Sequence, residues 1–373
     1  SDTLATARAL SLALTKGSYD LLMFGAHSVD AETGQVGPEV AEFMGIPQVT
    51  GVRKLEVMGG SFIRLERETD DAVETIECRL PAVISVVEGI APEVFPGREA
   101  VQAAREREVE EISAKDLADD ITVFGQSGSP TWVEDIQFIE SNRDQRILGV
   151  EVTADEAAEQ VAAYLKEKGL LDPAARGGRE VSGPVAPPDV RPSEGPAIWI
   201  VAEYTDRGLR GVTSELLGAA KTVADLIKGH VVGALLGGPE AREHAAALGQ
   251  AGADVVVVAA DDALSSYTTE AFASTLSTAI EEARPYAVLV PSTVNGRDLA
   301  ARVAARLGLG LTGDCVGLEV DAEGRLVQLK PAFGGNIVAP ILSKTKPYMT
   351  TIRPGLLERL RPTASRQAPI TEL

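Results

Sequence analysis

The sequence has few of the residues that build metal centres and disulfide frameworks. Among its 373 residues are two cysteines, Cys78 and Cys315, which lie far apart and form no CxxC pair, and three scattered histidines. We therefore expect neither a disulfide framework nor a zinc site. Aromatic residues make up only 4% of the chain. Because Ala, Val, Leu and Gly dominate instead, we expect helices that pack on buried strands.

Basic residues are also scarce, because 35 Lys and Arg stand against 55 Asp and Glu, a formal net charge of -20. Clustered positive charge is needed to bind nucleic acid or anionic lipid, so neither is an expected partner. The acidic surface is otherwise explained by solubility. No apolar run approaches the ~18 residues of a membrane span. Residues 1–3 lead directly into a helical pattern rather than a signal peptide, and we expect a soluble protein of the cytoplasm or of an organelle matrix.

An internal repeat divides the chain into two halves, as its length also suggests. A short apolar run, a helix that ends in glycine, and a strand that follows a proline recur in the same order. They occupy 19–24 and 286–291, 38–45 and 301–308, and 80–86 and 346–352, at offsets of 267, 263 and 266 (286 − 19, 308 − 45, 347 − 81). Helices alternate with short β-branched runs in both halves. The pattern predicts an α/β fold of two pseudo-symmetric domains, each a mostly parallel sheet flanked by helices.

The second half begins with three strands that have no counterpart in the first. We predict them at 197–202, 231–236 and 254–259, with helices around 215–220 and 241–248. The sheet of the first half is therefore expected to be completed by another chain or to belong to a fragment of a longer protein. We divide the chain into a first domain at 1–122, an arm at 123–176, a Pro/Gly-rich linker at 177–196, a second domain at 197–360 and a further linker at 361–373.

The loop after the first apolar run is four residues longer in the first half than in the second (267 − 263). It contains Thr33-Gly34-Gln35-Val36-Gly37-Pro38 directly before a predicted helix. Helix N-termini offer free N–H groups to phosphates, and ligands bind at the carboxyl ends of parallel strands. Gly34 and Gly37 would let the backbone approach a phosphate, and Thr33 and Gln35 could donate from their side chains. The alternative is a helix-capping turn without a ligand.

The matching loop of the second half, 292–298, gives a weaker signal. Asn295 or Asp298 could cap the following helix, and Arg297 could hold a carboxylate or a phosphate. We favour a structural interpretation of this loop.

Several motifs, taken together and in order, resemble electron-transfer flavoprotein (ETF). Those similar to the β subunit are 2–7, 29–38 and 125–131, and those similar to the first domain of the α subunit are 291–298, 333–336 and 352–355. The chain thus looks like the two subunits fused head to tail, an α/β pseudo-heterodimer within one chain. The resemblance implies that pieces are missing at both ends. The α-subunit domain that holds FAD would begin just after Leu373.

The resemblance implies an electron carrier, without catalytic side chains and without a catalytic metal. Family members take electrons from acyl-CoA and related dehydrogenases and pass them to a membrane ETF-quinone oxidoreductase, with FAD as the carrier. The β subunit usually holds AMP. By motif, its site would be formed by one segment of the first-half loop: Asp30, Thr33, Gly34, Gln35, Val36 and Gly37.

Alternatives stay open for the cofactor and for the function. The form of the motif at 33–38 is closer to the electron-bifurcating branch of the family, in which the same pocket holds a second FAD that receives hydride from NADH. The loop that docks onto dehydrogenases would fall at 92–98, where Phe95 is the candidate contact in place of the usual Leu. Outside the family, an adenine-nucleotide sensor of the stress-protein type or a ligand-free scaffold would share the α/β sheet.

Overall fold

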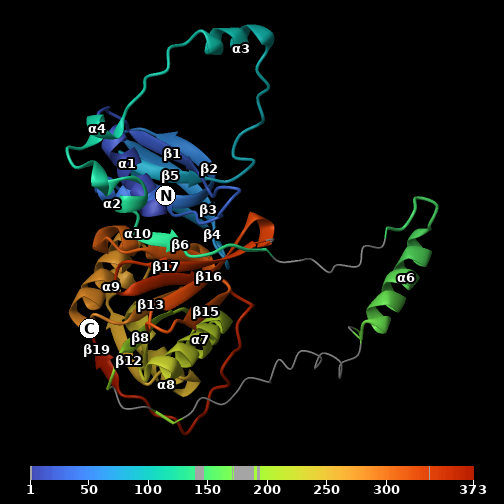
Figure 1. The fold of residues 1–373 in the computed structure, drawn as a ribbon, viewed down its shortest axis with the longest axis vertical. Coiled ribbons are helices and arrows are strands. Elements are labelled where there is room, and N and C mark those ends of the chain that lie inside the picture. Colours follow the sequence, from blue (N-terminus) through green and yellow to red (C-terminus); the bar gives the residue numbers. More distant parts are fainter. Residues whose placement is uncertain (1, 139–146, 170, 172–188, 191–193, 336) are drawn as a thin grey trace.

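The computed structural model describes residues 2–138, 147–169, 171, 189–190, 194–335 and 337–373. It contains two α/β units, formed by residues 2–86 and 194–373, which lie one on the other (Figure 1). Their main sheets are mostly parallel and flanked by helices, so the predicted fold class is confirmed. The predicted linker at 177–196 lies largely outside the described residues.

The first unit is built on a five-stranded sheet in the order β1-β5-β2-β3-β4. Its elements are α1 (Thr3–Leu14), β1 (Leu21–Gly25), α2 (Val36–Met44), β2 (Gln48–Met58), β3 (Phe62–Glu68), β4 (Val73–Arg79) and β5 (Ala82–Val86). β1, β5 and β2 run parallel, whereas β3 and β4 extend the sheet antiparallel. Because neighbouring strand residues point to opposite faces, Val83 packs with Ala7 and Val40 of the helices while Ile84 packs with Leu65 on the other side.

The second unit contains a seven-stranded, all-parallel sheet in the order β14-β18-β13-β8-β11-β12-β19. Its elements are β8 (Ala197–Ala202), α7 (Gly211–Ile227), β11 (His230–Gly237), α8 (Ala245–Ala251), β12 (Val255–Ala260), α9 (Thr269–Ala283), β13 (Ala287–Pro291), α10 (Val294–Leu307), β14 (Leu311–Cys315), β18 (Tyr348–Ile352) and β19 (Ile370–Glu372). Ile198 packs with Leu216 of α7, and the next residue, Trp199, packs with Leu276 of α9. Both faces are therefore covered by helices, as parallel sheets require.

The three additional strands predicted for the second half are present as β8, β11 and β12. The helix predicted at 241–248 differs from what the structure contains. A 3-10 helix, Pro239–His244, comes first and α8 follows it. Pro239 at the first helical position starts this tight turn directly after the strand, so the α-helical hydrogen bonds begin later than the sequence pattern indicates.

A separate antiparallel sheet joins the arm to the second unit. Its strands are β15 (Gly317–Val320), β16 (Leu326–Ala332), β17 (Ile337–Ser343), β6 (Thr131–Val133) and β7 (Gln137–Phe138). β6 and β7 come from the predicted arm, and both pair with β17. The arm also contains α6 (Ala154–Glu167), close to the predicted helix. Among the described residues, no helix combines the length and apolar composition that a membrane span requires.

Local geometry repeats at the predicted offsets. Gly45 ends α2 with φ 65° and ψ 33°, and Gly308 ends α10 with φ 64° and ψ 32°. The Ala26 N–H donates to the Val86 carbonyl at 3.0 Å, and the Ser292 N–H donates to the Ile352 carbonyl at 2.8 Å, each 266 residues further on (292 − 26, 352 − 86). The two strand ends therefore match in their hydrogen bonding, and the loops that follow them differ.

Candidate functional site

The two units meet along one face of α10. Asn295, Asp298, Arg302 and Arg306 are three or four residues apart, so they share that face. Their first-unit partners are Arg67 for Asn295, Gln48 and Thr50 for Asp298, and Glu42 for both arginines. Asp298 also accepts hydrogen bonds from Tyr267 at 2.9 Å and from Thr269. This buried polar interface holds the two loops of the repeat beside each other.

A cavity of about 330 Å³ lies between the two loops. The first unit lines it with Ala26, His27, Gly34, Thr50, Gly51, Arg53, Glu68, Asp70, Ser85 and Val87, and the second with Ser292, Val294, Arg297 and Asp298. Gly34 is the one predicted site residue among these described lining residues. It has φ 63°, and a Cβ there would lie 3.1 Å from the Ala26 carbonyl oxygen. The close approach of the backbone at Gly34 therefore requires glycine.

The first-unit loop presents free backbone amides. Within the described part of the chain, no hydrogen bond is made by the N–H groups of Thr33, Gly34, Gln35, Val36 or Gly37. They run from the cavity edge at Gly34 into the first turn of α2. Free amides at a helix N-terminus, together with the positive end of the helix dipole, form a site for an anion.

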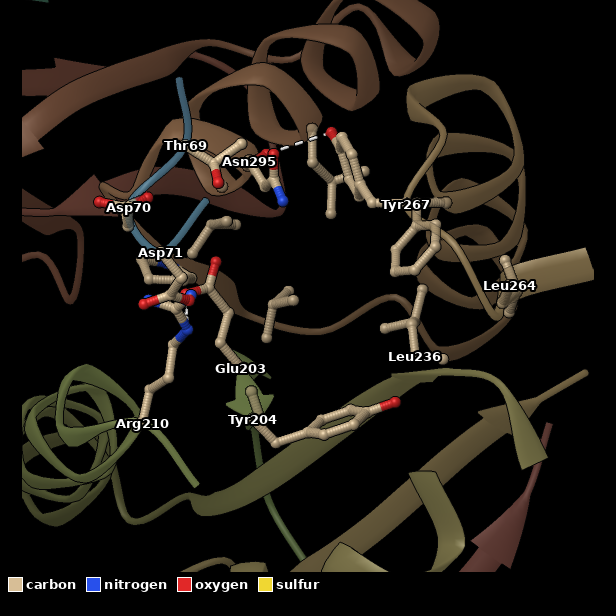
Figure 2. A pocket seen from close by; sticks show the side chains of 18 of the residues that line it. Thr69, Asp70, Asp71, Glu203, Tyr204, Arg210, Leu236, Leu264, Tyr267 and Asn295 are labelled. Carbon is tan, nitrogen blue, oxygen red and sulfur yellow. Dashed lines mark hydrogen bonds and ion pairs between the residues drawn. The ribbon is translucent and has the colours of Figure 1, made fainter. Parts of the chain in front are cut away.

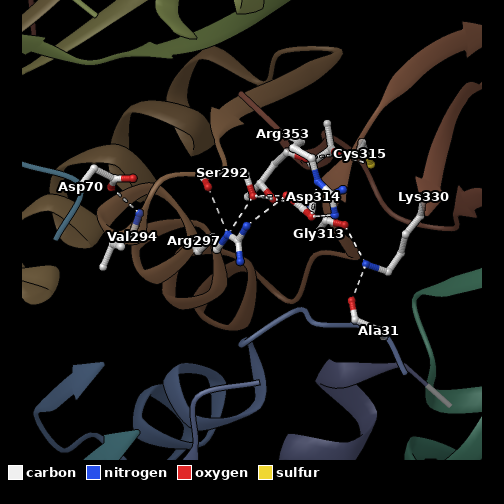
Figure 3. Close-up of polar contacts among 12 residues, drawn as sticks. Ala31, Asp70, Ser292, Val294, Arg297, Gly313, Asp314, Cys315, Lys330 and Arg353 are labelled. Atoms are coloured by element: carbon white, nitrogen blue, oxygen red, sulfur yellow. Dashed lines mark hydrogen bonds and ion pairs between the residues drawn. The ribbon is translucent and has the colours of Figure 1, made fainter. Parts of the chain in front are cut away.

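Two amides of the matching second-unit loop, those of Val294 and Gly296, are used by the protein itself. Asp70 reaches across from the β3–β4 turn, and its carboxylate accepts a hydrogen bond from the Val294 N–H at 2.8 Å (Figure 3). Thr293 caps α10 and accepts from the Gly296 N–H at 3.0 Å. The prediction that Asn295 or Asp298 caps this helix is therefore wrong, because both side chains point into the interface. The loop difference foreseen in the sequence corresponds to one open and one closed helix N-terminus.

Arg297 brings a positive charge to the cavity from the second unit. Its Nε donates to the Ser292 hydroxyl at 2.9 Å, and its Nη2 donates to Asp314 at 3.1 Å (Figure 3). Burial disfavours the charge of Asp314, but its ion pairs with Arg353 and Arg297 outweigh this and lower its pKa. Arg297 thus holds a carboxylate, one of the two roles foreseen for it, and its guanidinium is fixed at the cavity wall.

Lys330 clamps the first-unit loop to the second unit. Its ammonium donates to the carbonyl oxygens of Ala31 at 2.9 Å and Gly313 at 2.8 Å (Figure 3). Burial lowers the pKa of Lys330. A second clamp is the Phe333 N–H, which donates to the Asp30 carbonyl at 3.2 Å. The conformation of the loop therefore depends on the second unit.

The remaining predicted residues lie around this loop. The Asp30 carboxylate is exposed and accepts from the Ala31 N–H at 2.8 Å, and a hydrogen bond from Ser28 lowers its pKa. Gln35 is 2% exposed and its side-chain oxygen lies 2.8 Å from the Thr3 hydroxyl, so this side chain ties the loop to α1 through its oxygen. Gly37 is buried, and Thr33 and Val36 are half-buried. Phe95 lies apart from the site.

Burial disfavours the charged form of Glu39, in the first turn of α2. It is fully buried, and burial raises its pKa well above the ordinary value of 4.5. The Thr3 hydroxyl lies 2.9 Å from a Glu39 oxygen and 2.8 Å from the Gln35 oxygen. The Thr3 hydroxyl can donate its single proton to only one of these two oxygens. A proton on Glu39 would supply the second hydrogen bond. A neutral Glu39 leaves the positive end of α2 unopposed.

Asp70, Lys330 and Glu39 are the participants that sequence reasoning missed. Asp70 and Lys330 act across sequence separations of 224 and 299 residues, and no local pattern signals such contacts. The sequence pattern could have indicated Glu39, since an acidic residue between apolar positions near the start of a helix either interacts with the helix dipole or is buried. The polar residues on one face of the Ala-rich helix α10 could likewise have been predicted from their spacing of three and four residues.

Fold and site together define a class: a pseudo-twofold α/β protein with one open helix N-terminus at the cavity between its units. The chain belongs to the electron transfer flavoprotein domain family, whose model matches residues 1–117 and 198–373. It is 45% identical over 163 residues to the electron transfer flavoprotein subunit alpha of Thermoanaerobacterium thermosaccharolyticum, covering 43% of this chain and 49% of that protein.

The chain also resembles a second kind of subunit. It is 40% identical over 133 residues to the electron transfer flavoprotein subunit beta of the same organism, covering 35% of this chain and 51% of that protein. A third relative is the lactate dehydrogenase (NAD(+),ferredoxin) subunit LctC of Acetobacterium woodii, 41% identical over 157 residues, which are 42% of this chain and 37% of that protein. The chain thus spans about half the length or less of these relatives.

Proposed function

We propose that this chain is the nucleotide-holding base of an electron transfer flavoprotein, with a β-like first unit and an α-like second unit in one polypeptide. Partial similarity to both subunits of one organism supports this arrangement. The observation that carries the nucleotide proposal is the contrast between the two helix N-termini. The amides before α2 are free among the described residues, whereas Asp70 and Thr293 occupy those of α10.

The free amides at 33–37 would hold the phosphate of an adenine nucleotide, and Arg297 would face it across the cavity. Lys330 and the neutral Glu39 keep the loop in place and the helix end positive. A volume of about 330 Å³ is at the lower end of ligand pockets, so it suits the phosphate and ribose of one nucleotide. AMP would have a structural role here, whereas a second FAD would supply redox chemistry.

The proposed partners follow from the family. Electrons would come from acyl-CoA or related dehydrogenases and pass to ETF-quinone oxidoreductase, or come from NADH in a bifurcating form. The name of the LctC relative, which includes NAD(+) and ferredoxin, supports the bifurcating alternative. Phe95 is 85% exposed on the segment between β5 and α3 (Arg98–Arg105). Such an apolar side chain is suited to docking on a dehydrogenase.

The nucleotide can be identified by acid release from the purified protein followed by chromatography. AMP supports the common form of the family and FAD the bifurcating form. ATP would instead favour the stress-protein type of sensor, and the absence of any nucleotide would favour a scaffold. Visible absorbance distinguishes FAD from AMP independently.

A pair of glycine variants tests the loop itself. Gly34→Ala and Gly45→Ala both place a Cβ at positive φ, at 63° and 65°, and each should cost about 1–2 kcal/mol of stability. Only Gly34 borders the cavity. We expect Gly34→Ala to lose the copurified nucleotide and Gly45→Ala to keep it. Retention in both variants, or equal loss from both, would contradict the assignment of this loop.

A further inference from the structure

A second cavity, of about 360 Å³, lies at the carboxyl ends of the central strands of the second unit and is also lined by residues around the β3–β4 turn of the first unit (Figure 2). Glu203 follows β8, Gly237 ends β11 and Pro291 ends β13, and all three residues line it. β8 lies between β11 and β13, so the chain leaves β8 toward one side and later returns to the other. The crevice at such a switch point is the usual position of a ligand in an open α/β sheet.

The charged groups around this cavity disfavour anions. The helix N-terminus beside it is capped by Thr293, and its Val294 amide is occupied by Asp70 of the first unit. Arg210, the lining residue with a guanidinium, forms an ion pair with Asp71. A phosphate or carboxylate entering here would meet the carboxylates of Asp70, Asp71 and Glu203.

The walls that remain offer apolar surface and a hydrogen-bond acceptor. Figure 2 shows Glu203 and Arg210 on one side, and Tyr267, Leu236 and Leu264 on the other. One Glu203 oxygen accepts from the Thr293 hydroxyl at 2.6 Å. The other oxygen, Oε2, is buried and accepts no hydrogen bond from the described residues. Arg210 Nε lies 3.6 Å from Oε2, which is too long for a hydrogen bond. A buried acceptor of this kind calls for a donor.

We propose that this cavity binds a small molecule with an apolar or aromatic body and a cationic nitrogen, whose N–H donates to Glu203. Apolar residues of the strands, of α9 and α10 and of the 3-10 helix Asp262–Leu264 contact the body: Val201, Leu236, Leu264, Phe272, Val290 and Leu299. Asp70 has two roles in this arrangement. It seals the helix end against anions and adds negative charge beside the cationic head. The site shares Asp70 with the lining of the nucleotide cavity, but its other lining residues are different. The proposal does not depend on the function proposed for that cavity.

Benzylamine and benzyl alcohol are suitable probes, since they share a ring and differ in the cationic nitrogen. Titration calorimetry at about pH 8 keeps Glu203 ionised, because burial raises its pKa to about 7. We expect one benzylamine site, with affinity at least about tenfold above that of benzyl alcohol. Glu203→Gln should reduce the affinity for benzylamine to that for benzyl alcohol. The matched control Glu243→Gln, at an exposed position, should leave the affinity for benzylamine unchanged.

The comparison of the two probes on the unaltered protein needs no variant, so a Glu203→Gln protein that fails to fold still leaves a decisive measurement. Equal affinity for the two probes would overturn the proposal. So would benzylamine binding that persists undiminished in folded Glu203→Gln protein.

Discussion

Glu39 offers the sharpest test of the site, because it links burial, charge and the positive end of α2. The carboxyl group is fully buried and its pKa is raised by burial from an ordinary value of 4.5. The folded protein therefore binds this proton more tightly than the unfolded chain does. The contribution of Glu39 to stability is complete below about pH 4.5 and declines as the pH rises toward the folded-state pKa.

The magnitude follows from proton linkage. Between the two pKa values the folded state holds one more proton, so the free energy of unfolding falls by about 1.4 kcal/mol per pH unit through this group. Glu39→Gln removes the titration but keeps the shape and a hydrogen-bond donor. Within this interval of pH, the stability of Glu39→Gln relative to that of the unaltered protein should rise by about 1.4 kcal/mol per pH unit.

Urea unfolding at several pH values measures this difference directly. Glu108→Gln, an exposed position, is the matched control and should show no such trend. Below the folded-state pKa of Glu39, Glu39→Gln replaces one neutral side chain by another and should leave phosphate affinity within about twofold. If the stability difference between Glu39→Gln and the unaltered protein does not change with pH, Glu39 is not the buried acid described above.

Three further changes probe the interface and the cavity. Asp298→Ala leaves several buried donors without an acceptor and should destabilise the protein by about 3–5 kcal/mol in urea unfolding. Lys330→Met removes the ammonium that holds the Ala31 carbonyl, so amide hydrogen exchange in residues 26–35 should accelerate by about tenfold. Arg297→Gln should weaken binding of inorganic phosphate about tenfold in calorimetry, because one charge-assisted hydrogen bond is lost.

Each of these predictions has a distinct contrary outcome. A change below about 1 kcal/mol for Asp298→Ala would mean that the interface donors find other acceptors. Exchange that accelerates equally in β11 and in the loop of Lys330→Met would indicate global destabilisation rather than a released clamp. Unchanged phosphate affinity in Arg297→Gln would place the anion away from this side of the cavity.

Much of the fold followed from local patterns. The repeat, the three additional strands and the longer first-half loop could be predicted because strand and helix periodicities, and glycines at helix ends such as Gly45 and Gly308, act over a few residues. The prediction failed where tertiary contacts decide a local choice. Thr293, rather than Asn295 or Asp298, caps α10, because the interface with the first unit takes up those two side chains.

The amino-acid sequence by itself determined the α/β class, the two matching halves and the place where they differ, since each depends on neighbouring residues. Only the tertiary structure decided which helix end is open. Asp70 closes α10 from 224 residues away, and Lys330 holds the open loop from 299 residues away. Both contacts exist because two units dock, and docking depends on the shape and charge of whole surfaces that no short segment specifies.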